Sequence, residues 1–315
     1  MLNRRQLRIK VLQALYAYFQ SEEESIVKTD KELMQAVDRI HDLYVYLLLT
    51  FPELKWIAEH RIEENKKKIR PNDSDINPNL KFVNNQIIQK ITENSRLRMV
   101  SEDRKVNWLG DVNQEMFRKI FNTIRDSETY ILHMENGETG FQEDMAFAIE
   151  LFKEEIANSP LVYSYFEEKS IHWLDDIDLI CQMVIKTIKS MDENEDLQVM
   201  SLYKDQEDEQ DFIKTLLRKT IAMDSENLAL IDELTDNWEL DRIAKMDVLL
   251  MKMAITEFQL FKSIPTKVTL NEYIEISKFY STPKSHAFIN GILDKAIDRL
   301  TKDGKINKMG RGLMN

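Results

Sequence analysis

The sequence predicts an all-α protein, and its composition and hydrophobic periodicity support this fold class. Its 315 residues include only seven glycines and six prolines, the two residue types least compatible with helix interiors. Alternating Val, Ile and Thr runs, which indicate strands, are almost absent. Apolar residues recur instead at the three- and four-residue spacing of amphipathic helices. Hydrophobic residues make up 43% of the chain, enough for a large core or two domains.

The cysteine content and the lengths of the apolar runs indicate in which cellular compartment the protein is expected. Cys181 is the only cysteine, which excludes a disulfide within the chain and favours a reducing environment. No apolar run approaches the roughly 18 residues of a membrane span, and the basic N-terminus lacks a cleavage-type segment. We therefore expect a cytoplasmic protein without a membrane partner.

Charge is distributed unevenly along the chain. The net charge is −12, yet residues 1–21 hold Arg4, Arg5, Arg8 and Lys10 and no acid, whereas residues 192–211 hold nine acids and one lysine. This pattern predicts local binding of a polyanion at the N-terminus. The acidic run is expected to be a solvated linker.

The first helix is predicted from Asn3 to Gln20. Its apolar face consists of Ile9, Val11, Leu12, Leu15, Tyr16 and Phe19. Arg4 and Arg8 project into the same sector as part of this face, so we expect the first two turns to protrude and hold the arginines in solvent. Arginine forks suit phosphates and Tyr16 offers a stacking surface, a combination typical of single-stranded nucleic-acid binding. This helix alone is equally consistent with a solvated basic helix end.

A long helical region follows the first helix. Helices are expected over 29–68, with a break at Pro52, and over 80–133, with a loop near Gly110; residues 71–79 and 134–142 are polar loops. A Trp-x-x-Asp pattern at Trp173 recurs at Trp238. A duplicated helix pair and a chance match between amphipathic helices explain it equally well.

The C-terminal stretch begins with a helix expected from Leu240 to Ser263. Its apolar residues recur at helical spacing, and Pro265 disfavours helix at the residue before it. Asp247 projects into the middle of the apolar arc. A buried carboxylate must be paired or hydrogen-bonded. Asp247 therefore either caps a helix or meets an arginine inside the core, or it belongs to a partner interface.

Two further helices are marked by their start signals. Thr269 and Glu272 have the spacing of a capping box, which predicts a short helix over 271–279. Thr282 followed by Pro283 places a hydroxyl at the N-cap and proline at the first helical position of the last helix. The apolar stripe of that helix is Ile289, Ile292, Leu293, Ala296, Ile297 and Leu300.

Lys284, Phe288 and Gly291 lie along one ridge beside this stripe, at helical spacing. A glycine inside a helix costs ~1 kcal/mol relative to alanine, so Gly291 indicates that something approaches the backbone closely. The approaching group is either a neighbouring helix or a ligand.

Catalytic and cofactor motifs are missing from the sequence. The five histidines are scattered, the chain has no H-E-x-x-H or paired-cysteine spacing, and no glycine lies between Phe141 and Asn290 to build a phosphate loop. We expect neither an enzyme nor a cofactor.

Two stretches carry a family resemblance. The N-terminal run RRQLRIKVLQALYAY and the C-terminal run IPTKVTLNEYIEISKFYSTPKSHAFINGILDKAIDRL resemble the NusB family of bacterial transcription antitermination factors. The resemblance implies an all-helical bundle of two small subdomains. It also implies binding of boxA-type single-stranded RNA together with the ribosomal protein NusE, as part of the transcription elongation complex and in support of rRNA synthesis.

Candidate site residues are carried over by position. The basic arm and first-helix tyrosine of the family match Arg4, Arg5, Arg8 and Tyr16, and an RNA-contacting aromatic of the last helix matches Phe288. Lys284 stands where better-known members have an acid, and Ala287 where they have a lysine. The predicted RNA-binding set is Arg4, Arg5, Arg8, Tyr16, Lys284 and Phe288. The candidates for the NusE side are Asp241 and Asp247.

Typical family members are less than half as long as this chain, which determines the predicted domains. We expect residues 1–24 and 205–302 to form a discontinuous NusB-like domain, residues 25–204 a helical insertion with its own small core, and residues 303–315 a flexible basic tail. A non-catalytic adaptor whose insertion binds protein partners is the alternative function. NusB-like domains also occur fused to rRNA cytosine methyltransferases, but this chain lacks the glycine-rich cofactor loop of such an enzyme.

Overall fold

The structure is a computed structural model that describes residues 2–21, 25–170, 173–235 and 242–309. Helices dominate these residues and no strand occurs among them, which confirms the predicted all-α class. Within the same residues, no helix combines the length and the apolar character needed to cross a membrane.

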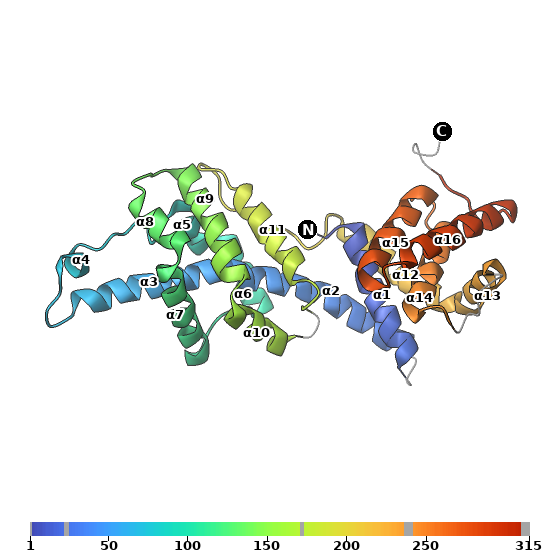
Figure 1. Cartoon of the computed structure of the whole chain (residues 1–315), viewed down its shortest axis with the longest axis horizontal. Helices are drawn as coiled ribbons and strands as arrows, with labels where there is room; N and C mark the ends of the chain where they lie inside the picture. The colour runs from blue at the N-terminus through green and yellow to red at the C-terminus, as the bar shows by residue number, and fades with distance from the viewer. Residues whose placement is uncertain (1, 22–24, 171–172, 236–241, 310–315) are drawn as a thin grey trace. The chain divides into compact units, whose positions relative to one another are not determined.

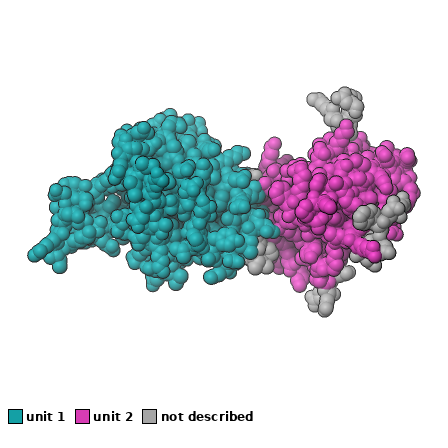
Figure 2. Space-filling view, in the orientation of Figure 1, with its two compact units in different colours: residues 1, 38–202 teal, residues 2–37, 203–315 magenta. Residues whose placement is uncertain are grey.

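The chain divides into two compact units, coloured separately in Figure 2. Unit 2 comprises residues 2–37 and 203–315, and unit 1 comprises residues 38–202. The helix α2 (Ile26–Leu48) continues from one unit into the other, and the boundary after Val37 lies further along the chain than the one expected from the sequence at residue 24. Asp30 of α2 forms an ion pair with Arg218, which shows why the start of this helix belongs to unit 2.

Unit 2 is organised around α14. The helices of this unit other than α2 are α1 (Arg4–Gln20), α12 (Gln206–Ala222), α13 (Asp224–Leu234), α14 (Lys245–Leu260), α15 (Thr266–Tyr280) and α16 (Ser285–Lys302). Every other helix of that list contacts α14, and Figure 1 shows α14 between them. Residues 249–258 of α14 are all buried, so α14 forms the core against which the N- and C-terminal parts of the chain pack.

The capping box expected at Thr269 does not form. α15 begins at Thr266, directly after Pro265, and no side chain caps it. The Thr269 hydroxyl donates instead to Glu257 (2.7 Å), and Glu272 pairs with Arg5. The prediction was wrong because both residues that match the local pattern have tertiary partners, and the helix begins one turn earlier than the pattern predicts.

The last helix begins later than its start signals predict. α16 starts at Ser285, while Pro283 and Lys284 belong to a turn in which the Ser285 amide donates to the Thr282 carbonyl (2.9 Å). α14 ends at Leu260, before the expected Ser263.

Parts of the acidic run and of the C-terminal tail make structure or contacts that the sequence does not predict. Residues 206–211 form the first turns of α12, where carboxylates complement the helix dipole, so the prediction of a linker is wrong for them. In the tail, Lys308 Nζ donates to the carbonyls of Glu257 (3.2 Å) and Phe261 (2.9 Å), and the Met309 amide donates to Lys262 (2.9 Å). Lys308 thereby caps the C-terminus of α14, a contact that the sequence does not predict.

Unit 1 has a core of its own. After α2 its helices are α3 (Thr50–Lys66), α4 (Asp73–Ile76), α5 (Gln86–Glu93), α6 (Ser95–Arg104), α7 (Asp111–Asp126), α8 (Glu128–Glu135), α9 (Phe141–Leu151), the π-helix η1 (Phe152–Ala157), α10 (Pro160–Lys169) and α11 (Ile177–Lys189). Trp108 is buried and donates from Nε1 to the Tyr46 carbonyl (3.0 Å). Trp173 is also buried and donates to the Arg39 carbonyl (2.8 Å). Buried aromatic side chains from distant parts of the sequence thus close a separate core.

Candidate nucleic-acid interface

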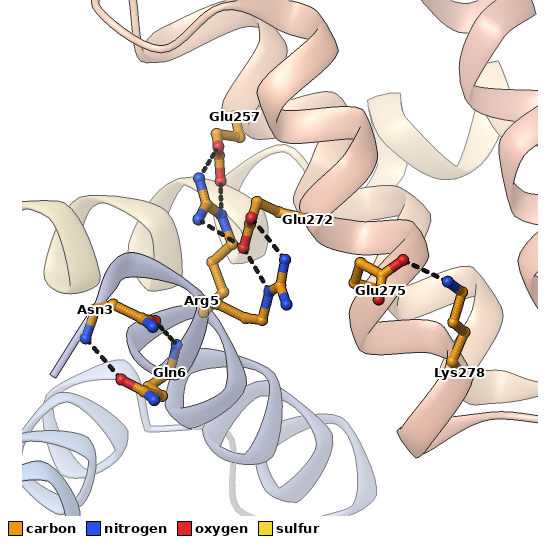
Figure 3. Close-up of polar contacts among 8 residues, drawn as sticks. Asn3, Arg5, Gln6, Glu257, Glu272, Glu275 and Lys278 are labelled. Atoms are coloured by element: carbon orange, nitrogen blue, oxygen red, sulfur yellow. Dashed lines mark hydrogen bonds and ion pairs between the residues drawn. The ribbon is translucent and has the colours of Figure 1, made fainter. Parts of the chain in front are cut away.

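The start of α1 is fixed by a capping box that the sequence analysis did not identify. The Asn3 amide donates to Gln6 Oε1 (2.6 Å), and the Gln6 amide donates to Asn3 Oδ1 (3.1 Å). Figure 3 shows this reciprocal pair beside Arg5. The helix therefore begins at Arg4, and α1 contacts α12, α14 and α15.

Arg8 is inside unit 2 and not in solvent. Its relative exposure is 1%, and its Nε and Nη2 donate to the two carboxylate oxygens of Glu257 (2.8 and 2.5 Å). Tyr273 and Thr269 donate to the same carboxylate (3.1 and 2.7 Å). Burial lowers the pKa of Arg8, but the bonds to Glu257 outweigh it and raise that pKa above its ordinary value. The expected overhang of α1 is wrong at this residue.

Arg5 has an acidic partner at the edge of the unit. Its Nε and Nη2 donate to the two oxygens of Glu272 (2.8 and 2.9 Å), and 42% of its side chain is exposed. Figure 3 shows Glu272 and Glu257 facing α1 from α15 and α14. Hydrogen bonding to Glu272 is the main cause of the raised pKa of Arg5. Glu272 also lies 3.8 Å from Arg8 Nη1, so the two ion pairs are joined.

Arg4 reaches the acidic run. Its Nη2 lies 2.5 Å from Asp208 Oδ2, and its guanidinium lies 4.4 Å from the centroid of the Phe212 ring. The Arg4 side chain is 33% exposed and that of Asp208 is 60% exposed. All three arginines that were predicted to bind RNA thus have carboxylate partners. These carboxylates come from three other helices, so a helical wheel of α1 alone cannot show them.

Tyr16 lies on an open surface. It is 41% exposed and lines an open cavity of about 450 Å³ together with Phe19, Leu228, Lys245 and Lys252. Lys252 Nζ lies 5.2 Å from the centroid of the Phe19 ring and 2.6 Å from Asp224. An exposed phenol ring beside lysines has the composition of a base-stacking surface.

Asp247 fixes the turn between α15 and α16. It is buried and accepts hydrogen bonds from the hydroxyls of Ser281 and Ser285, the latter at 2.6 Å. Asp247 is thus hydrogen-bonded inside the unit, as a buried carboxylate must be, but its partners among the described residues are two hydroxyls and neither an arginine nor a backbone amide at a helix end. The other acidic candidate, Asp241, lies outside the described residues.

The turn held by Asp247 presents the remaining candidates. Lys284 is exposed at the N-cap of α16, and Phe288 is half-buried one turn later. Apart from its chain neighbours and the backbone of its own helix, no described atom lies within 4 Å of the position that a Cβ on Gly291 would occupy. Of the two alternatives for Gly291, a neighbouring helix is not found within the described chain, and the glycine leaves a bare, exposed patch of backbone beside Phe288.

One exposed aromatic residue was missed. Phe279, near the C-terminus of α15, is 81% exposed. The buried residues of α15 are Thr269, Tyr273, Ile276 and Ser277. At 100° per residue Phe279 lies off that stripe, both in α15 and in the shorter helix expected over 271–279, so a helical wheel could have identified it.

The described residues show little that is typical of a catalytic centre. They contain no group of three or more His, Cys, Asp or Glu side chains arranged to hold a metal ion. Burial raises the pKa of Cys181 to about 12, which leaves the thiol protonated and unreactive at neutral pH.

Residues 177–298 match the model of the NusB family. Three proteins named transcription antitermination protein NusB are similar to part of the chain. The protein of Salinibacter ruber is 44% identical over 104 residues, which are 33% of this chain and 65% of that protein. The protein of Chloroherpeton thalassium is 42% identical over 105 residues, 33% of this chain and 50% of that protein. The protein of Natranaerobius thermophilus is 39% identical over 95 residues, 29% of this chain and 66% of that protein.

The chain therefore spans between half and about two thirds of the length of these relatives. No solved structure matches it significantly. The family match begins at α11, in unit 1, and does not include α1, although α1 packs on α12 and α14 within unit 2. The match and the sequence similarity together show that residues 177–298 of this chain are similar to the NusB family.

Proposed function

We propose that the protein is a non-catalytic, RNA-binding transcription antitermination factor. Its similarity to the NusB family supports this role, and relatives with 39–44% identity are named as antitermination proteins. The RNA is proposed to be single-stranded and boxA-type, bound jointly with the ribosomal protein NusE during rRNA transcription. Unit 2 is the proposed RNA-binding part of the chain.

The observation that carries the proposal is the surface at the N-terminal end of α16. An exposed lysine, an aromatic ring and bare backbone follow one another there as Lys284, Phe288 and Gly291, and the exposed Phe279 lies near the end of the preceding helix. The positive end of the helix dipole adds to the Lys284 charge, which favours a phosphate. Aromatic rings stack on bases of any sequence.

The three arginines are proposed to have different tasks. Arg4 and Arg5 are partly exposed and can turn from their carboxylates towards phosphates. Arg8 is buried with Glu257, so we assign it the task of holding α1, and with it Tyr16, against α14.

The NusE side is proposed to include Asp241 and, indirectly, Asp247. The Asp247 carboxylate is already bonded to Ser281 and Ser285. It would therefore act by keeping the turn between α15 and α16 in place for the partner.

Fluorescence anisotropy with a boxA-like RNA, with and without NusE, tests the proposal. Phe288→Ala should weaken binding by ~1–3 kcal/mol with little change in the salt slope, because stacking is lost and phosphate contacts remain. Lys284→Gln should make the slope shallower by about 0.7, the value for one phosphate contact on a single strand. If Phe288→Ala lowers only the melting temperature, the ring belongs to the core and the assignment is wrong.

An adaptor is the alternative, because residues 38–176 form most of unit 1 and lie outside the family match. An adaptor predicts that NusE does not enhance binding and that matched and scrambled RNA are retained equally. Enhanced, sequence-selective retention contradicts it.

A further inference from the structure

Unit 1 contains an open cavity of about 500 Å³ where α3, α4, α7 and α8 meet, at the end of the unit where Figure 1 places α4. Its apolar lining includes Ile62, Ile131 and Met134. The ring of Tyr130 also lines the cavity and packs on the buried Phe82 (ring centroids 5.5 Å apart). This volume is within the range of small-molecule sites and far exceeds the ~30 Å³ share of one water. The cavity can therefore hold a ligand of nucleotide size.

Two of the three basic residues that line the cavity have no acidic partner. Lys68 pairs with Asp75 (2.8 Å), and these charges cancel. Arg61 donates to the neutral Asn122 side chain (2.7 Å). Among the described residues, no carboxylate lies within ion-pair distance of Arg61 or Arg125. Glu135 also lines the cavity, so the charged side chains of the lining are three basic and two acidic residues, and the two guanidinium groups lie outside any ion pair of the described chain.

Arg61, Arg125 and Tyr130 line the same cavity. Burial and the nearby Arg125 lower the pKa of Arg61. Burial raises the pKa of Tyr130, while Arg125 and Arg61 both act to lower it. The Tyr130 hydroxyl makes no hydrogen bond within the described chain. Two arginine forks and a phenol hydroxyl therefore share one region without a common acceptor.

We propose that this cavity is a binding site for a nucleoside monophosphate group, with Arg61, Arg125 and Tyr130 as donors to the phosphate. A phosphate monoester carries about −1.5 to −2 at neutral pH and so balances two guanidinium groups, whereas a carboxylate balances only one. The apolar wall of Ile62, Ile131 and Met134 receives the nucleoside. The group comes either from a free nucleotide or from the 5′-phosphate end of an RNA strand. The site lies in unit 1 and does not depend on the function proposed for unit 2.

Isothermal titration of the full chain tests the site. The probes are 5′-AMP, adenosine, inorganic phosphate, and a single-stranded oligoribonucleotide with and without a 5′-phosphate. Either 5′-AMP or the phosphorylated oligonucleotide should bind saturably and at least tenfold more tightly than adenosine or the unphosphorylated strand, because charge-assisted bonds to phosphate are lost. Binding of only the phosphorylated strand identifies RNA ends as the source. Binding of 5′-AMP identifies a free nucleotide.

Variants assign the binding to these residues. Arg61→Gln with Arg125→Gln should weaken it at least tenfold, and Tyr130→Phe several-fold. Arg96→Gln with Arg98→Gln removes the same charge from exposed positions that do not line the cavity and should change nothing. If the double variant of Arg61 and Arg125 does not fold, the affinities of the single variants Arg125→Gln and Tyr130→Phe test the assignment. No saturable heat at millimolar concentration, equal binding of inorganic phosphate and 5′-AMP, or an equal loss in the control variant overturns the proposal.

Discussion

Two sets of arginines, one in each unit, have opposite surroundings. In unit 2, Arg4, Arg5 and Arg8 each pair with a carboxylate from another helix. In unit 1, Arg61 and Arg125 line a cavity without a carboxylate in ion-pair distance among the described residues. The arginines that stand out in the sequence are thus the ones that form ion pairs. Those without an ion pair among the described residues lie in helices where acids are frequent. Local charge along a chain does not determine which charges are available to a ligand, because neutralising partners come from distant segments.

Breaking the buried pair should have the largest effect. Arg8→Ala leaves Glu257 buried with only Thr269 and Tyr273 as donors. Loss of one partner of a buried ion pair costs ~3–5 kcal/mol, so the free energy of unfolding should fall by that amount. Urea denaturation followed by circular dichroism measures it. Arg4→Ala, in an exposed pair, is the control and should cost less than about 1 kcal/mol. Equal effects of the two substitutions contradict the difference in burial.

Removal of the Asp247 carboxylate should have a smaller effect. Asp247→Ala deprives the hydroxyls of Ser281 and Ser285 of their acceptor, at a cost of ~1–3 kcal/mol. Thermal denaturation should show the loss. Asp294→Ala removes an exposed acid of α16, which is bonded to Asn290, and should leave the melting temperature nearly unchanged. An unchanged melting temperature for Asp247→Ala shows that the turn does not need this carboxylate.

Acidification should act on unit 1. Burial is the main cause of the lowered pKa of both His41 and His133. Each folded-state pKa lies below the unfolded value of about 6.5, so the unfolded chain binds more protons as the pH falls. The stabilisation is present above about pH 6.5 and is lost as the pH falls through the folded pKa. The urea midpoint, followed by tryptophan fluorescence, should be lower at pH 5.5 than at pH 7.5.

Trp56, Trp108 and Trp173 belong to unit 1, so this signal reports mainly on that unit. His41→Gln with His133→Gln should flatten the pH dependence, although the variant is less stable at neutral pH. If the urea midpoint of this variant depends on pH as steeply as that of the unchanged chain, the pH dependence comes from other groups.

The accuracy of prediction depended on whether a feature is determined locally. Helical periodicity is local, and the all-α class followed from it. The start of α15 was predicted wrongly because Thr269 and Glu272, which match a capping box, are bonded to Glu257 and Arg5 instead. The prediction that α1 protrudes and holds its arginines in solvent was wrong for the same reason. Sequence spacing cannot show that Glu257 and Asp208 pair with arginines of α1. Asp247 was recognised as a buried carboxylate because its position in an apolar arc is a local signal.

The smallest effect is expected where basic and acidic segments meet in solvent. Arg4 pairs with Asp208, and both side chains are partly exposed. In our proposal Arg4 exchanges this carboxylate for a phosphate of the RNA. Exposed pairs are worth ~0.2–1 kcal/mol. Asp208→Asn should therefore tighten RNA binding by about two- to fivefold at low salt.

A matched variant separates the ion pair from net charge. Asp211→Asn removes the same charge from an exposed position of α12 at which no described arginine forms an ion pair. It should change the affinity less than Asp208→Asn in anisotropy titrations at about 50 mM salt. The difference between the two variants should shrink as the salt concentration rises, because the Debye length falls from about 10 Å at 0.1 M to about 3 Å at 1 M. Equal effects of the two substitutions reduce the role of Asp208 to its contribution to net charge, and a gain that persists at 1 M salt contradicts electrostatic competition for Arg4.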